Sequence, residues 1–305
     1  MLRKYQIKDG KLIENGHEDC PVLVYINPDE NEKRFLIDQL LLDEHTLNSA
    51  LDPNELGRIE FESNHNAIII KRPKRYSSDD NFLLKISSTG IFFFTDKIVI
   101  LLAEDVPLFE GRTFTKIRSV PDLLLKIIHR CIFHFEEHLQ VIHKISDELE
   151  REINQALSNR DLLHMFNLEK SLVYYLNAIS SNSRVIDKLK TNLAKFNFSP
   201  EDSEFLEDVI IENTQCYEQA STYSEVLSGM MDAWVSIVSN NLNIRIKTLT
   251  VMMICIMVPT LVVSIFSMNV KLPFAHDSVI SFWVVIALAM FSFLSVFYIQ
   301  RHRRW

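Results

Sequence analysis

Two long apolar stretches lie near the C-terminal end of the chain. Residues 248–270 contain no charged side chain, and neither do residues 278–300. A bilayer core of ~30 Å needs about 20 apolar helical residues, so each stretch is long enough to span it. Buried helices of a soluble protein are the alternative, but two such stretches side by side at one end favour membrane spans. We predict transmembrane helices over 248–270 and 279–300, an outer loop over 271–278 and a tail over 301–305.

The first 117 residues have a different pattern, with short runs rich in Ile, Val and Phe between turn residues. Such runs are typical of β-strands. Strands are predicted at 21–26, 59–62, 67–71, 82–86, 91–94 and 97–102, turns at 87–90 and 95–96, and a helix over 29–43. The pattern predicts an α+β domain over 1–117, with a mixed sheet and helices.

Long helices are predicted after Pro121, because neither Pro nor Gly occurs again before Pro200. Amphipathic patterns cover 123–157 and 161–196, separated by residues 158–160, so residues 118–198 are expected to form paired helices. Ser199 and Pro200 are typical of a helix start. The helix that begins there is expected to form a stalk over 199–247 and to continue to about Ser267, roughly 100 Å. A break near Gly229 is the alternative.

Charge divides the chain in the same way. Residues 1–240 contain 26 Lys and Arg against 39 Asp and Glu, a net of −13, whereas residues 241–305 contain six basic residues and one acid. Five of those six flank the predicted spans on one side, so the positive-inside rule places both termini in the cytoplasm. No basic patch indicates nucleic acid as a partner. An apolar signal-peptide core is not found at the start of the sequence.

Signatures of common enzymes are not found in the sequence. It contains no GxSxG, no HExxH and no Gly-rich phosphate loop. The four cysteines are scattered, which favours reduced thiols over structural zinc or disulfides. His129, His134, His138 and His143 are spaced by five, four and five residues, so they do not hold one helical face. We predict no catalytic residues, no enzyme activity and no organic cofactor.

Several segments together resemble one known family. The residues are Ser239-Asn240-Asn241-Leu242-Asn243 before the first span, Val258-Pro259-Thr260 within it, Ser267-Met268-Asn269 at its outer end, the basic tail Arg301-His302-Arg303-Arg304-Trp305, and the N-terminal pieces 50–55, 58–60 and 68–71. This sequence resembles the CorA family of divalent-cation channels along its whole length. The resemblance implies a CorA-like funnel. Ser267 stands where the family has the glycine of its Gly-Met-Asn signature.

The resemblance also implies a function. It indicates a homopentamer in the cell (inner or plasma) membrane that passes Mg2+, and also Co2+ or Ni2+, into the cytoplasm, with membrane lipid as its surroundings and cytoplasmic divalent cation closing it. Ser267, Met268 and Asn269 would form the selectivity filter. Two alternatives stay open: a Zn2+ or other transition-metal transporter of the same superfamily, and a non-conducting membrane-anchored sensor or scaffold.

A pore-lining face follows from helical spacing. Steps of three or four from Asn243 select Ile246, Thr250, Met253, Met257, Thr260 and Ser264. Small and polar members of a span tend to face protein or water, but the methionines could equally pack against neighbouring helices.

Two carboxylates on the stalk helix are predicted to bind a regulatory metal. Asp232 and Asp208 fall where the family has regulatory carboxylates, counting back from the signature. A solvated surface acid is the alternative for each. Their partner on an adjacent subunit is left open among Asp96, Glu104 and Asp105.

Overall fold

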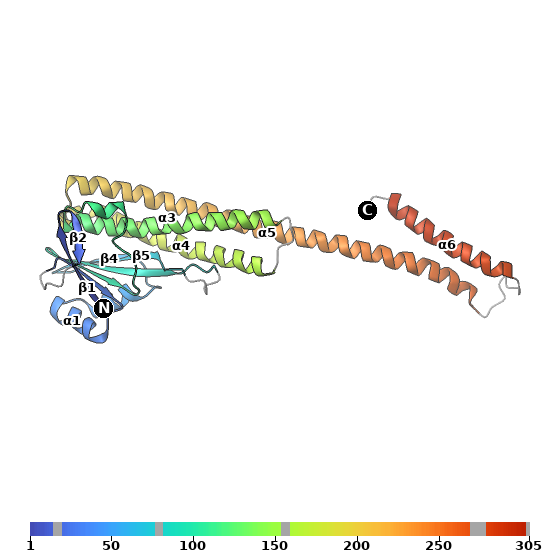
Figure 1. The fold of residues 1–305 in the computed structure, drawn as a ribbon, viewed down its shortest axis with the longest axis horizontal. Coiled ribbons are helices and arrows are strands. Elements are labelled where there is room, and N and C mark those ends of the chain that lie inside the picture. The colour runs from blue at the N-terminus through green and yellow to red at the C-terminus, as the bar shows by residue number, and fades with distance from the viewer. Residues whose placement is uncertain (15–19, 77–81, 154–158, 269–278, 303–305) are drawn as a thin grey trace. The chain divides into compact units, whose positions relative to one another are not determined.

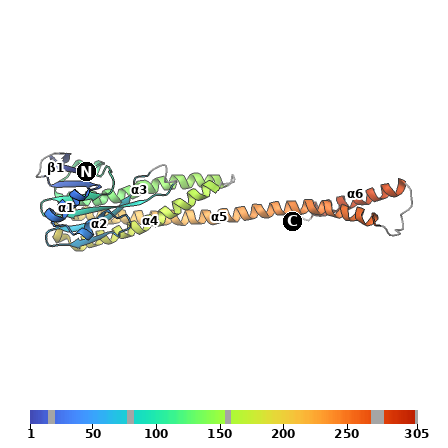
Figure 2. The ribbon, with the colours of Figure 1, turned by 90° about the horizontal axis from the view of Figure 1, so that it is seen from below.

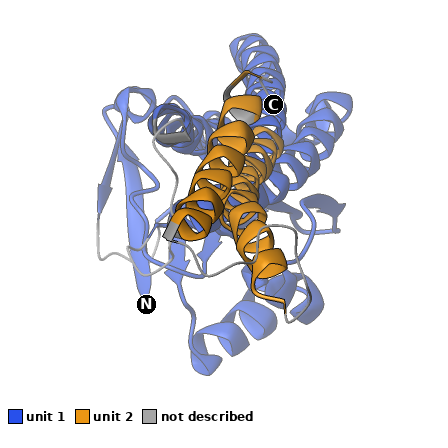
Figure 3. Cartoon of the chain, turned by 90° about the vertical axis from the view of Figure 1, so that its right-hand side faces the viewer, with its two compact units in different colours: residues 1–231 blue, residues 232–305 orange. Residues whose placement is uncertain are grey.

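The computed structural model of the chain describes residues 1–14, 20–76, 82–153, 159–268 and 279–302. It divides into two compact units, Met1–Met231 and Asp232–Trp305, which are coloured separately in Figure 3. Each unit is described by itself below.

A seven-stranded mixed sheet forms the centre of the first unit (Figure 1). Its strands are β1 (Leu2–Lys8), β2 (Lys11–Glu14), β3 (Val22–Ile26), β4 (Arg58–Phe61), β5 (Asn66–Pro73), β6 (Ile86–Phe93) and β7 (Ile98–Leu102), in the order β2-β1-β3-β7-β6-β5-β4. All neighbours pair antiparallel except β3 and β7, which run parallel.

Helices cover both faces of this sheet, as Figures 1 and 2 show. The helices α1 (Glu30–Leu40) and α2 (Glu44–Leu51) lie on one face, and α3 (Val120–Ile153) and α4 (Asn159–Thr191) lie on the other. The chain continues with α5 (Pro200–Phe266) and, in the second unit, α6 (Val279–His302). Two short 3-10 turns, η2 (Arg112–Thr115) and η3 (Leu193–Phe196), precede α3 and α5. Successive side chains of a strand point to opposite faces. In β7, Ile100 therefore belongs to the core under α3 and α4, whereas Leu101 belongs to the core under α1 and α2.

The predicted fold class is confirmed: a mixed sheet with helices, long helices and two long apolar C-terminal helices. The helix expected from Pro200 to about Ser267 is α5, continuous across Gly229, so the predicted alternative of a break there is wrong. The Ser199 hydroxyl accepts a hydrogen bond from the Asp202 N–H (3.1 Å), and the Asp202 carboxylate accepts one from the Ser199 N–H (3.0 Å). This reciprocal cap explains why the helix begins there.

The predicted turn at 87–90 is wrong, because these residues lie inside β6. The Ser88 hydroxyl donates to the Asp52 carbonyl (2.6 Å), so its polarity is satisfied within the core. A Cβ on Gly90 would lie 2.4 Å from the Ala50 Cβ, so this glycine permits close approach of α2 and does not mark a turn.

Predictions made from the sequence differ from the structure in three further places. Residues 82–85 are not a strand: Phe82 has a φ of 64°, and the Leu84 N–H donates to the Ser171 hydroxyl (2.8 Å) on α4. Asn159 and Arg160 belong to α4 and not to the break expected between the long helices, while Ser158 lies outside the described residues. The strands β1 and β2 and the short helix α2 were not predicted from the sequence.

A buried asparagine joins the helices to the sheet. The last residue of β5 that pairs with β4 is Ile69, so beyond it this edge of β5 needs other partners. Asn182 on α4, fully buried, accepts from the Lys71 N–H (2.8 Å) and donates to the Lys71 carbonyl (2.9 Å). Its amide thus replaces a neighbouring strand.

Replacing this asparagine tests its role. We expect Asn182→Ala to lower the free energy of unfolding by about 2–4 kcal/mol, because two buried backbone groups lose their partners. Urea denaturation of the detergent-solubilised protein, followed by circular dichroism, measures the change. Asn177→Ala, on an exposed position of the same helix, is the matched control; equal effects of the two substitutions would contradict the interpretation.

Candidate ion pathway and membrane segment

Two helices of the second unit are long and apolar enough to cross a membrane: the C-terminal part of α5, and α6 over Ile280–Ile299. Hardly any residue of either apolar stretch is buried within the chain. Large apolar side chains such as Met257, Leu261 and Phe291 are more than half exposed. A contiguous apolar surface of this size is typical of contact with lipid or with other copies of a helix.

The polar groups of the first span are mostly satisfied within the helix. The Thr250 hydroxyl donates to the Ile246 carbonyl (2.9 Å), and the Thr260 hydroxyl donates to the Ile256 carbonyl (2.7 Å). Such bonds let hydroxyls enter an apolar medium. Pro259 has no N–H, so it leaves the Cys255 carbonyl without its usual helical donor.

The seven residues predicted to line a pore lie on one face of α5. On an ideal helix they fall within an arc of about 100°. All seven are exposed in the described chain: Asn243, Ile246, Thr250, Met253, Met257, Thr260 and Ser264. Exposure alone does not single them out, because neighbours on other faces are exposed too. Their distinguishing feature is the polar outer end of the stripe, Thr260 and Ser264.

The first residue of the predicted filter ends the helix. The Ser267 hydroxyl donates to the Ser264 carbonyl (2.9 Å), and its N–H donates to the Val263 and Ser264 carbonyls (both 3.2 Å). Ser267 is not among the described non-glycine residues with a positive φ. A serine here therefore needs none of glycine's conformational freedom. Met268 is exposed, and Asn269 lies outside the described residues.

Asp208 and Asp232 are both exposed on α5, and about 36 Å of helical rise separates them. Among the described residues no three His, Cys, Asp or Glu side chains gather in a geometry suited to a metal. A site at either aspartate therefore needs ligands from elsewhere, such as another copy of the chain.

The carboxylates considered as partners are already engaged within the chain, apart from Asp96, which is exposed. Asp105 makes a bidentate pair with Arg3 (2.6 and 3.0 Å). Glu104 lies 3.3 Å from the buried Arg72. Glu104 and Asp105 would have to leave these arginines in order to bind a metal.

The N-terminal pieces that resemble the family come together as a buried polar cluster. The Lys71 ammonium donates to the Pro53 carbonyl (3.0 Å) and to the Ser88 hydroxyl (2.8 Å). Burial lowers the pKa of Lys71 to about 8. These contacts join the segment after α2 to β5 and β6, so the role of these pieces is structural.

Comparisons with known proteins show which family the chain belongs to. Residues 23–302 match the family model described as CorA-like Mg2+ transporter protein. The cobalt/magnesium transport protein CorA of Methanocaldococcus jannaschii is 25% identical over 319 residues, covering 98% of this chain and 97% of that protein. The protein of the same description from Thermotoga maritima is 23% identical over 235 residues, 73% of this chain and 65% of that protein.

Solved structures agree. The complete structure of the CorA magnesium transporter from Methanocaldococcus jannaschii superimposes with a TM-score of 0.83 at 25% identity, covering 100% of this chain and 98% of that one. The full-length CmaX protein shares the fold, with a TM-score of 0.75 at 14% identity and coverage of 99% and 97%.

A mixed α/β domain, long helices and two exposed apolar C-terminal helices together define a membrane transport protein. The chain belongs to the family of CorA-like Mg2+ transporter proteins, and it is therefore a divalent-cation transporter of that family.

Two threonines of α5 form a matched pair for testing the pore face. Thr248 makes the same hydroxyl bond to the carbonyl four residues before it (2.9 Å). On an ideal helix it lies at least about 120° from all seven residues of the predicted face. We expect Thr260→Val to lower divalent-cation flux into liposomes several-fold, because a water-binding hydroxyl leaves the pore. Thr248→Val should leave the flux unchanged; the reverse order would place the pore on another face.

Proposed function

We propose that this chain forms a homopentameric channel that passes Mg2+, together with Co2+ or Ni2+, into the cytoplasm. Membership of the CorA-like Mg2+ transporter family is the observation that supports this proposal most strongly. Two spans in one chain cannot enclose a pore, so several identical chains must assemble around an axis. The number five comes from the family resemblance.

The proposed pathway runs along the face from Asn243 to Ser264. Thr260 and Ser264 supply hydroxyls to water near the outer end. Met253, Met257 and Ile246 form an apolar constriction, which can gate by excluding water. With both termini in the cytoplasm, the Asn243 end faces inward and Ser267 lies at the outer side.

The proposed filter consists of Ser267, Met268 and Asn269. Mg2+ loses its hydration water reluctantly, so a filter for it should hydrogen-bond to the hydrated ion. Strong ligands that strip the water would trap the ion. A ring of Asn269 side-chain oxygens, one per subunit, offers neutral acceptors of this kind. The Ser267 hydroxyl is turned back onto the Ser264 carbonyl, which leaves the ring to Asn269.

The filter assignment is tested by removing the amide. We expect Asn269→Ala to abolish Mg2+ flux into liposomes, or to reduce it at least tenfold, while the oligomer keeps its size on gel filtration. Ser267→Gly should keep transporting, because the Ser267 backbone is of a kind that any residue adopts. Comparing the wild-type flux of Mg2+, Zn2+, Co2+ and Ni2+ decides the transported ion. Undiminished flux in Asn269→Ala would contradict the filter.

Regulation is proposed to act through Asp232, with Asp208 as a second candidate. Both side chains are exposed, so each can reach a cation bound between subunits. Without the cation, acidic faces repel and the subunits separate more readily. The ion shifts the equilibrium only by its different affinity for the closed and open states. High cytoplasmic Mg2+ would then close the channel.

Neutralising this carboxylate tests the regulation. We expect Asp232→Asn to make flux several-fold less sensitive to cytoplasmic Mg2+, and to weaken the protection that Mg2+ gives against proteases. Glu218→Gln is the matched control, since Glu218 is also exposed on α5. An unchanged Mg2+ dependence in Asp232→Asn would make Asp232 a solvated surface residue.

A further inference from the structure

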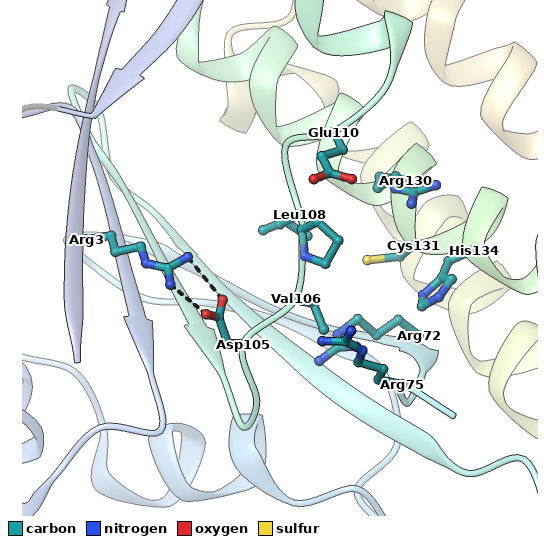
Figure 4. Close-up of a pocket in the computed structure, with 11 residues that line it drawn as sticks. Arg3, Arg72, Arg75, Asp105, Val106, Leu108, Glu110, Arg130, Cys131 and His134 are labelled. Carbon is teal, nitrogen blue, oxygen red and sulfur yellow. Dashed lines mark hydrogen bonds and ion pairs between the residues drawn. The ribbon is translucent and has the colours of Figure 1, made fainter. Parts of the chain in front are cut away.

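The first unit contains a cavity of about 610 Å3 on the side of the sheet that faces α3 (Figure 4). Four parts of the chain supply its walls: β1, the end of β5 with the residues just after it, the segment that follows β7, and the middle of α3. Its charged lining residues are Arg3, Arg72, Arg75, Asp105, Glu110 and Arg130. Cavities of this size are typical of sites for small organic ligands.

Positive charge is concentrated in this cavity. Four arginines line it against two acids, Asp105 and Glu110, although residues 1–240 as a whole have a net charge of −13. Asp105 is occupied by its bidentate pair with Arg3, at one side of the cavity in Figure 4. Arg72, Arg75 and Arg130 come from β5, the residues just after it and α3.

Arg72 is the residue that points to a ligand. Its side chain is 2% exposed. Its Nη1 donates to the Pro73 carbonyl (3.0 Å) and lies 3.3 Å from the Glu104 carboxylate. Its Nε and Nη2 have no hydrogen-bond partner among the described residues. These two nitrogens form one edge of the planar guanidinium, the edge that receives two oxygens of a carboxylate or phosphate side by side.

Leaving this edge of the Arg72 guanidinium without a hydrogen-bond acceptor lowers the stability of the folded chain. A buried donor without a partner destabilises the folded protein, and it does so more strongly when the group is charged. A chain that keeps an arginine here, with two more arginines lining the same cavity, is arranged to receive an anion. The demand of three guanidinium groups suits a phosphoryl group, with about two negative charges and three terminal oxygens, better than a single carboxylate.

Two other titratable groups of the cavity, His134 and Cys131, are neutral, whereas Arg130 already donates to the Glu137 carboxylate (3.0 Å) and would be shared between Glu137 and a bound anion. Burial, with His138, Arg130 and Arg72 nearby, lowers the pKa of His134 to about 3, so its imidazole is neutral. Burial raises the pKa of the Cys131 thiol to about 11, so it is neutral too. The rest of the lining is apolar, supplied by Val106, Pro107 and Leu108. This side of the cavity suits the uncharged part of an organic phosphate.

We propose that this cavity is a binding site for a small phosphate-bearing anion, held by Arg72, Arg75 and Arg130 with its uncharged part against Val106–Leu108. The site lies in the first unit, and the proposal does not depend on whether the chain conducts ions. A phosphate compound bound there would contact Arg72, which also pairs with Glu104.

Calorimetric titration of the purified full-length protein with inorganic pyrophosphate, in buffer free of divalent cations, tests the proposal. We expect saturable binding to the wild type, weakened about tenfold or more in Arg75→Gln and in Arg130→Gln, since each removes a charged donor. Arg75 is exposed and Arg130 is only partly buried, so neither substitution removes a core side chain. Arg34→Gln, an exposed arginine on α1, is the matched control and should bind as the wild type does.

Two results would overturn the proposal. The first is absence of pyrophosphate binding to the wild type. The same absence is expected if a carboxylate from a second copy of the chain occupies the cavity instead of a phosphate. In that case Arg75→Gln should shift the oligomer toward smaller species on gel filtration. The second is an equal affinity in Arg34→Gln, Arg75→Gln and Arg130→Gln, which would mean that pyrophosphate binds elsewhere.

Discussion

The first unit depends on buried polar side chains of α4 that replace missing strand partners. β4 is shorter than β5, so the backbone of Lys71 has no strand beside it on the side away from β6, and Asn182 supplies both a donor and an acceptor there. Ser181 accepts a hydrogen bond from the Gly57 N–H (2.6 Å), just before β4, and Ser171 accepts one from the Leu84 N–H (2.8 Å), just before β6. Buried backbone groups must be paired, so α4 can lie on the sheet in only one register. The core under α3 and α4 is built on that register.

A change in the environment of α5 separates the two units. Up to Met230 the helix buries one residue in each turn or so, among them Leu206, Val209, Cys216 and Leu227, in the same core as α3 and α4. From Asp232 onward its side chains are almost all exposed within one chain. Exposed apolar surface on that scale is costly in water. The second half of the helix therefore requires lipid or neighbouring copies, as expected for a membrane transporter.

Ser267, at the position where the resemblance implies a glycine, fits the local geometry of the helix end. The serine closes the last turn through its hydroxyl and keeps an ordinary backbone. A change at this position therefore leaves the geometry of α5 intact up to the predicted filter. In the proposed channel, discrimination between ions would then fall to the groups beyond Ser267, chiefly Asn269.

The sequence by itself determined the features that depend on local pattern. The apolar stretches identified both spans, and Ser199 with Pro200 marked the start of a 67-residue helix, because caps and helical periodicity involve residues a few positions apart. Only the tertiary structure decided that residues 87–90 are a buried strand, since Ser88 and Gly90 are explained by Asp52 and Ala50, far from them in sequence. The arginine cavity was equally hidden, because Arg3, Arg72 and Arg130 are brought together only by the order of the strands and the packing of α3. Contacts between residues distant in sequence leave no periodic signal, so the fold alone reveals them.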